Sequence, residues 1–158
     1  MEKDINLDLS FRLWDLLKTM GAEVVQTRDS VKDMLIIEKP DIAFSSGVDI
    51  LISIHANVGG GGYLSTGGTS TDWYNPFWAP LVESIYNCLL ETGLLEFGVV
   101  GSFNYTVTRT SQMPAIHVEQ VLMTNAEVEE KLADPFFHQL IAEKICAGII
   151  DYLRQLKK

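Results

Sequence analysis

The sequence lacks the features that mark three broad classes of protein. It contains no apolar run near the roughly 20 residues that a membrane-spanning helix needs, so no transmembrane segment is expected. Its 21 Asp and Glu residues outnumber its 12 Lys and Arg residues, and a net charge of −9 argues against binding of nucleic acid. Only two cysteines are present, Cys88 and Cys146, both in apolar helical stripes; this excludes a disulfide-rich scaffold and predicts buried thiols.

The rest of the composition is that of a globular domain. With 47% hydrophobic residues among 158, the chain can bury roughly 70% of its unfolded surface, and we expect a single domain over residues 1–158. Helical and strand patterns alternate, from an amphipathic helix that ends at Gly21 to a long helix that starts at Asp134-Pro135. Strands are predicted over residues 22–27, 48–54, 69–74, 103–109 and 114–119. This alternation predicts a three-layer α/β/α fold with a mostly parallel sheet of about five strands.

Two of the predicted strands end in side chains that could carry chemistry. His55 ends the apolar run 48–54, and Glu119 ends the run that begins at Pro114. Open α/β sheets bind ligands at the carboxyl ends of their strands, and a buried carboxylate needs a partner. Together with Glu2, at the acidic start of the first helix, these residues are the ingredients of a zinc hydrolase site. The structural alternatives are a core histidine, a helix-start acid at Glu2 and a paired carboxylate at Glu119.

The order and spacing of several short segments resemble the zinc-dependent N-acetylmuramoyl-L-alanine amidases of the type 3 peptidoglycan amidase family. The segments are Glu2–Leu7, Gly21–Arg28, Ser53–Asn57, Gly68–Thr71 and Val118–Glu119 followed by Thr124-Asn125. The resemblance implies that Glu2 and His55 are ligands of Zn²⁺ and that Glu119 is the catalytic glutamate. The family's first zinc histidine lies in a Gly-His-Gly-Gly stretch after an opening strand, upstream of the first residue here. We therefore expect an amino-terminally truncated amidase domain, with about six strands in the intact family fold.

Three further residues are candidates for supporting roles. Asn57 and Arg109 are candidates for binding the peptide stem of the substrate. His117 lies on the same strand face as Glu119, because side chains alternate along a strand, and it is an auxiliary candidate. We expect it to be a hydrogen-bonded neighbour rather than a ligand. The chain departs from the family at Glu38-Lys39-Pro40, where an arginine is common, and at Gln120-Val121-Leu122, where a small and an aromatic residue are common.

The resemblance implies hydrolysis of the amide bond between N-acetylmuramic acid and L-alanine in bacterial peptidoglycan, as in a cell-wall autolysin. Two alternatives stay open: a catalytically impaired amidase-like domain with a wall-binding or regulatory role, and a related zinc peptidase or deacetylase. The family implies a periplasmic or extracellular location, although no signal-peptide pattern opens this chain. A sheet that lacks one strand should expose an apolar edge, which predicts poor solubility or oligomerisation.

Overall fold

The computed structural model describes residues 2–30, 34–56, 68–110, 112–121 and 126–157, the side chains of residues 126–129 excepted. Its helices are α1 (Glu2–Thr19), α2 (Glu38–Ser45), α3 (Ala79–Leu90), α4 (Ala126–Ala133) and α5 (Pro135–Gln155), and its strands are β1 (Leu51–His55), β2 (Thr69–Trp73), β3 (Glu96–Val100) and β4 (Ala115–Glu119). None of the described helices combines the length and apolar character needed to cross a membrane.

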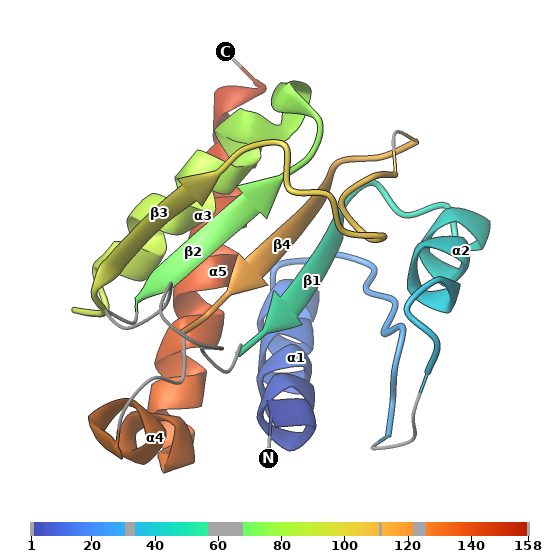
Figure 1. Ribbon diagram of the computed structural model, residues 1–158. Coiled ribbons are helices and arrows are strands. Elements are labelled where there is room, and N and C mark those ends of the chain that lie inside the picture. The colour runs from blue at the N-terminus through green and yellow to red at the C-terminus, as the bar shows by residue number, and fades with distance from the viewer. Residues whose placement is uncertain (1, 31–33, 57–67, 111, 122–125, 158) are drawn as a thin grey trace.

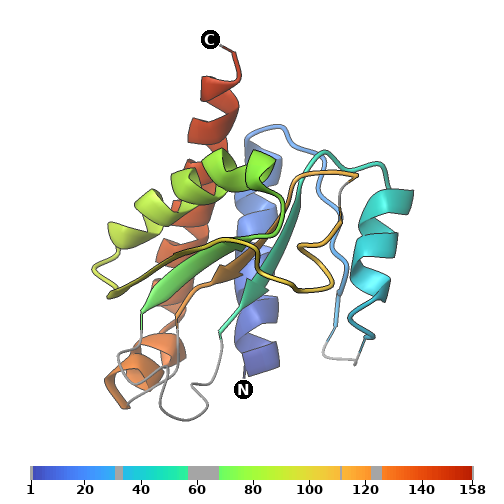
Figure 2. The ribbon, with the colours of Figure 1, turned by 45° about the horizontal axis from the view of Figure 1, so that its top comes forward.

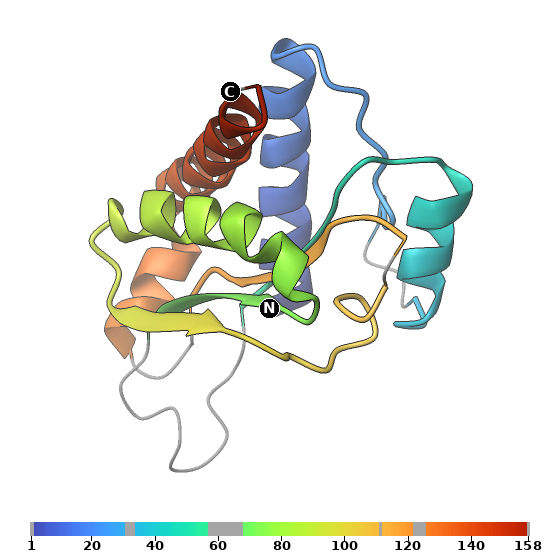
Figure 3. The ribbon, with the colours of Figure 1, turned by 90° about the horizontal axis from the view of Figure 1, so that it is seen from above.

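The strands form one sheet in the order β1-β4-β2-β3 (Figure 1). The pairs β1–β4 and β2–β3 are parallel, whereas β2–β4 is antiparallel. Helices α1, α3 and α5 lie together on one face of the sheet, as the turned views show (Figures 2 and 3). On the other side, α2 contributes Ala43 to a small cluster with Leu51 and Ala115. The predicted α/β class with a mostly parallel sheet is confirmed, with four strands in the described part of the chain.

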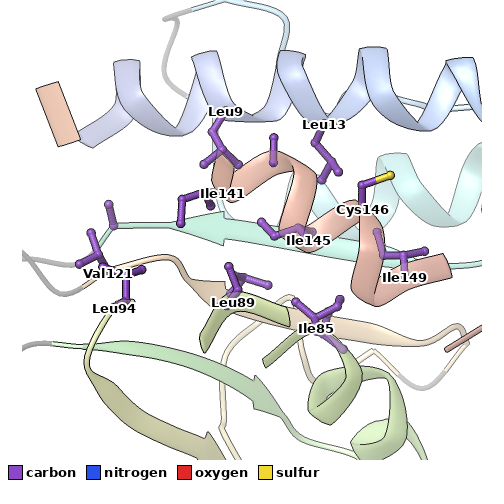
Figure 4. Close-up of a cluster of buried hydrophobic side chains, with 14 of the residues drawn as sticks. Leu9, Leu13, Ile85, Leu89, Leu94, Val121, Ile141, Ile145, Cys146 and Ile149 are labelled. Carbon is purple, nitrogen blue, oxygen red and sulfur yellow. The ribbon is translucent and has the colours of Figure 1, made fainter. Parts of the chain in front are cut away.

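The main core lies between the sheet and helices α1, α3 and α5 (Figure 4). Leu9, Ile85, Leu89 and Ile145 are fully buried in it. Helix α5 can approach α3 closely because residue 148 is glycine: a Cβ there would lie 2.5 Å from the Cα of Ile85. The predicted start of α5 is also confirmed, since the Asp134 side chain accepts a hydrogen bond from the Phe136 amide at 2.9 Å.

The predicted strand over residues 22–27 is wrong, because this segment pairs with no strand in the described part of the chain. The Gln26 side chain instead donates to the Ser10 carbonyl at 2.9 Å, and the Arg28 guanidinium donates to the Lys3 carbonyl at 2.7 Å. Residues 26–28 line one part of a cavity of about 90 Å³, and residues 51–54 of β1 line another. An extended segment becomes a strand only when its backbone groups pair with another strand.

The predicted strand over residues 103–109 is also wrong, and a strand farther upstream was missed. The Thr108 hydroxyl donates to the Phe103 carbonyl at 2.6 Å and accepts from the Tyr105 amide at 3.2 Å, so a local turn replaces strand pairing. The missed strand is β3, which carries Gly98 at φ 132° and has no fully buried residue. Its pattern is neither apolar nor alternating, which is why periodicity did not identify it.

Candidate active site

Polar side chains line one face of the sheet across three adjacent strands. The strand register places Ser53, His117 and Asp72 in one row and His55, Glu119 and Ser70 in the next. Directly opposite residues share a face, and the side chains between them point the other way. Ile116 and Val118 accordingly belong to the main apolar core. The sheet therefore separates the main apolar core under the helices from a polar face, formed by these two rows beside the small apolar cluster of Leu51 and Ala115, that carries the candidate site.

Helix α1 and strand β1 bring two of the predicted residues together. Glu2 Oε1 lies 3.4 Å from His55 Nδ1, and the Asn6 amide donates to the same Glu2 oxygen at 3.2 Å. Both side chains of the Glu2–His55 pair are part-exposed, at 37% and 29%. This separation exceeds the usual 2.7–3.2 Å of a nitrogen–oxygen hydrogen bond. It matches the distance of about 3.3–3.4 Å between two ligand atoms of a tetrahedral zinc ion at bond lengths of 2.0–2.1 Å.

The third predicted residue, Glu119, lies deeper and is bonded to His117. A hydrogen bond of 2.8 Å joins His117 Nε2 and Glu119 Oε1, and both side chains are almost completely buried. The His117 ring also stacks on the His55 ring, with centroids 4.5 Å apart and planes 28° apart. Tyr105 and Phe103 pack against His117 with centroid distances of 5.0 and 5.4 Å. The two stacked imidazoles thus connect the part-exposed Glu2–His55 pair with the buried His117–Glu119 pair.

The surroundings of His55 favour its neutral form. Burial lowers the pKa of His55 to about 4, and the neighbouring His117 and Lys39 act in the same direction against the carboxylates of Glu119 and Glu2. The pKa of Lys39 is itself lowered, by burial and then by the nearby Arg28. A neutral imidazole is the form that coordinates a metal ion. At neutral pH, His55 is therefore in the protonation state that ligation requires.

Asp72 belongs to the same polar face but was not identified from the sequence. It is 1% exposed, and burial raises its pKa to about 7 despite the attraction of His117 and a hydrogen bond with Ser70. The only sequence signal was an aspartate inside the predicted strand 69–74, which is unusual because Asp is depleted in strands.

The remaining candidates fall outside this group. Asn57 lies outside the described residues. Arg109 is exposed beyond the turn at Thr108, and in the described part of the chain no hydrogen bond or ion pair joins it to Glu2, His55 or Glu119. Its backbone amide donates to the Tyr105 carbonyl at 3.0 Å. Its role in binding the peptide stem of the substrate stays a prediction.

A metal ion would find an incomplete donor set in this part of the chain. Among the described residues, no group of three or more His, Cys, Asp or Glu side chains is arranged to hold a metal ion. Glu2 and His55 supply one oxygen and one nitrogen at a separation that suits zinc. A catalytic zinc site usually has three protein ligands and an open position. The residues present therefore fit two of the three protein ligands.

Comparison with known proteins extends over almost the whole chain. Residues 1–151 match the protein family described as N-acetylmuramoyl-L-alanine amidase. Protein YqiI of Bacillus subtilis (strain 168) is 31% identical over 159 residues, a match that covers 98% of this chain and 75% of YqiI. The N-acetylmuramoyl-L-alanine amidase LytC of the same strain is 30% identical over 159 residues, and here the match covers 98% of this chain and 32% of LytC.

Solved structures give the same result. The catalytic domain of CwlV, an N-acetylmuramoyl-L-alanine amidase from Bacillus (Paenibacillus) polymyxa var. colistinus, superposes with a TM-score of 0.89 at 29% identity, covering 98% of this chain and 86% of that one. The amidase AmiC2 of Nostoc punctiforme gives a TM-score of 0.88 at 30% identity, with 97% and 84% covered. The family match, together with the relatives similar in sequence and fold, shows that this chain belongs to the N-acetylmuramoyl-L-alanine amidase family.

Proposed function

We propose that this chain is the catalytic domain of a zinc-dependent hydrolase that cuts the amide bond between N-acetylmuramic acid and L-alanine in peptidoglycan. The observation that supports it most directly is the convergence of Glu2, His55 and Glu119 at one end of the paired strands β1 and β4. Their acidic and imidazole side chains come from segments more than 50 residues apart in the sequence. With peptidoglycan as the substrate, the place of action is the cell wall.

Glu2 and His55 are the proposed zinc ligands. Their 3.4 Å separation, together with the depressed pKa of His55, suits joint coordination by a carboxylate and a neutral imidazole. When bound, zinc polarises a carbonyl oxygen and makes water more acidic. The Asn6 amide, which donates to Glu2 Oε1 at 3.2 Å, orients the carboxylate, as partners of metal ligands commonly do.

Glu119 is the proposed proton-transfer residue. As general base it takes a proton from the attacking water, and as general acid it delivers that proton to the departing amine of L-alanine. Its hydrogen bond with His117 holds the carboxyl group in the buried end of the site. His117 is thus a neighbour that orients Glu119, and the stacked His55 ring lies on the way from this pair to the surface.

An amidase-like domain without activity is the second candidate. It is favoured by one observation, the lack of a third metal-binding side chain grouped with Glu2 and His55 among the described residues. A domain of this kind would bind wall polymer or regulate another enzyme without cutting the substrate. Zinc affinity and hydrolysis separate the two candidates.

The test measures bound zinc per chain and the products of peptidoglycan digestion. Zinc is titrated into three samples of metal-free protein: the chain alone, the chain with added imidazole, and a version with a Gly-His-Gly-Gly stretch ahead of Glu2. Imidazole can supply a further nitrogen ligand. We expect binding that is lost in Glu2→Gln and His55→Ala but kept in the control Glu38→Gln. Mass spectrometry should detect a free lactyl carboxylate on the muramic acid. Absence of zinc binding and hydrolysis in every version would leave the inactive domain as the explanation.

A further inference from the structure

A buried carboxyl group next to the candidate site has no part in the reaction described above. Asp72 lies on the internal strand β2 and is 1% exposed. Its Oδ1 atom is buried and has no hydrogen-bond partner in the described part of the chain, although Ser70 contributes a hydrogen bond to the carboxyl group. Burying a carboxyl group inside a sheet is unfavourable unless other groups compensate. A residue of this kind at this depth indicates a role beyond packing.

Asp72 faces His117 across the antiparallel pair β2–β4. The two residues are directly opposite in the register, which places their Cβ atoms on the same face about 4.5–5.5 Å apart. The Nδ1 atom of His117 is likewise buried and has no partner among the described residues. The other ring nitrogen, Nε2, bonds to Glu119 Oε1 at 2.8 Å. His117 is thus bonded to Glu119 through Nε2 and lies opposite Asp72 in the strand register, while its Nδ1 and the Asp72 Oδ1 atom each lack a hydrogen-bond partner among the described residues.

We propose that Asp72 is a positioning residue for Glu119, acting through His117 in a buried Asp72–His117–Glu119 array that fixes which ring nitrogen of His117 carries the proton. This inference rests on the proposed role of Glu119 in proton transfer. An ionised Glu119 can only accept, so in that state Nε2 of His117 carries the hydrogen of their 2.8 Å bond. A hydrogen bond between the Asp72 carboxyl and Nδ1, which the described structure does not contain, would stabilise that arrangement, because the carboxyl can donate to the lone pair of the neutral ring or accept from the N–H of the cation.

The ring contacts around His117 cannot do the same work. Stacking on His55 and packing against Tyr105 and Phe103 restrain the plane of the imidazole. They do not distinguish Nδ1 from Nε2, since both lie in that plane. A polar group in the plane of the ring is needed to select the tautomer, as orienting carboxylates do for histidines in other active sites. The strand register places Asp72 opposite His117 on β2 and Ser53 opposite it on β1, and of these two only Asp72 carries a carboxyl group.

The test is ring nitrogen NMR on the ¹⁵N-labelled chain, which has three histidines. We compare the wild type with Asp72→Val, Asp72→Asn and the control Ser53→Ala, which changes the neighbour of His117 on its other side in the same row. In Asp72→Val we expect shifted His117 ring signals and exchange of its Nε2–H with water about tenfold faster or more. Asp72→Asn should restore most of the wild-type pattern, because its amide can donate to Nδ1.

The signals of His138, which is far along the chain and bonded to Asp8 and Leu132, report whether each variant is folded. If Asp72→Val does not fold, Asp72→Ala takes its place. Unchanged His117 signals in the folded apolar variant, or an equal change in Ser53→Ala, would overturn the proposal. In the zinc-loaded protein the apolar variant should lower kcat about 10–100-fold with KM unchanged. If no version of the protein hydrolyses peptidoglycan, the proposed function fails, whereas the NMR comparison still decides the role of Asp72.

Discussion

Asp72 should make the protein less stable as the pH rises, and its replacement by asparagine should remove that loss. Burial raises the pKa of Asp72 from an ordinary value of 3.8 to about 7 in the folded protein. Between these values the folded chain keeps a proton that the unfolded chain releases. The contribution of this group to stability therefore falls as the pH rises from about 4, and the loss is complete above about pH 7.

The size of the effect follows from the two pKa values. A difference of about three pKa units, at 1.36 kcal/mol each, corresponds to about 4 kcal/mol as an upper value. Asparagine has the shape of the protonated carboxyl group but no charge to desolvate. The Asp72→Asn variant should therefore match the wild type near pH 4 and exceed its free energy of unfolding by up to about 4 kcal/mol above pH 7.

Urea unfolding followed by tryptophan fluorescence between pH 4 and 8.5 measures this difference, and subtraction of the two curves cancels groups that titrate equally in both proteins. The control is Asp49→Asn, at an exposed carboxylate, where we expect a difference within about 0.5 kcal/mol at every pH. A flat difference for Asp72→Asn, or a variant less stable than the wild type at pH 8, would refute the reasoning.

Three further changes test separate parts of the molecule. Glu119→Gln should lower hydrolysis about 10²–10⁴-fold while zinc content stays unchanged, and hydrolysis at wild-type rate would remove Glu119 from the mechanism. His138→Ala removes the 2.7 Å hydrogen bonds by which His138 links Asp8 of α1 to the Leu132 carbonyl of α4. It should lower the free energy of unfolding by about 1–3 kcal/mol, and an unchanged midpoint of chemical unfolding would contradict a stabilising role for this link. Gly148→Ala should lower the melting temperature measured by circular dichroism, because the added Cβ would lie 2.5 Å from the Ile85 backbone. Such overpacking costs about 1–3 kcal/mol, which exceeds the stability gained from the higher helix propensity of alanine.

Local pattern was enough to predict the residues at the ends of β1 and β4. His55 and Glu119 each end an apolar run, and alternation along β4 predicted that His117 would share a face with Glu119, which their 2.8 Å hydrogen bond confirms. The start of α5 was equally local, since Asp134 and Pro135 define it through capping. Such features depend on residues a few positions apart, which a single sequence displays directly.

The wrong strand over residues 22–27 and the overlooked Asp72 concern interactions between distant segments, whereas the wrong strand over residues 103–109 concerns a local turn. Residues 22–27 have a strand-like sequence, but a strand also needs a neighbour, and a cavity lies between residues 26–28 and β1. At residues 103–109 the hydroxyl of Thr108 closes a turn that alternation alone does not reveal. Asp72 was not identified from the sequence because its importance depends on which strand lies beside β2 and in which direction that strand runs.

The register of β2 against β4 is therefore the feature on which the polar face depends. Side chains alternate with a period of two, so a slip of one residue would turn Asp72 towards the helices and bring Thr71 to the polar face. That slip is opposed from the apolar side, where the Thr71 hydroxyl donates to the Val82 carbonyl of α3 at 3.1 Å. Ile116 and Val118 of β4 are fully buried under the helices, and burying each of them contributes about 1.5–3 kcal/mol. The packing that stabilises the fold thereby also holds His117 and Glu119 on the opposite face, where the chemistry is proposed to occur.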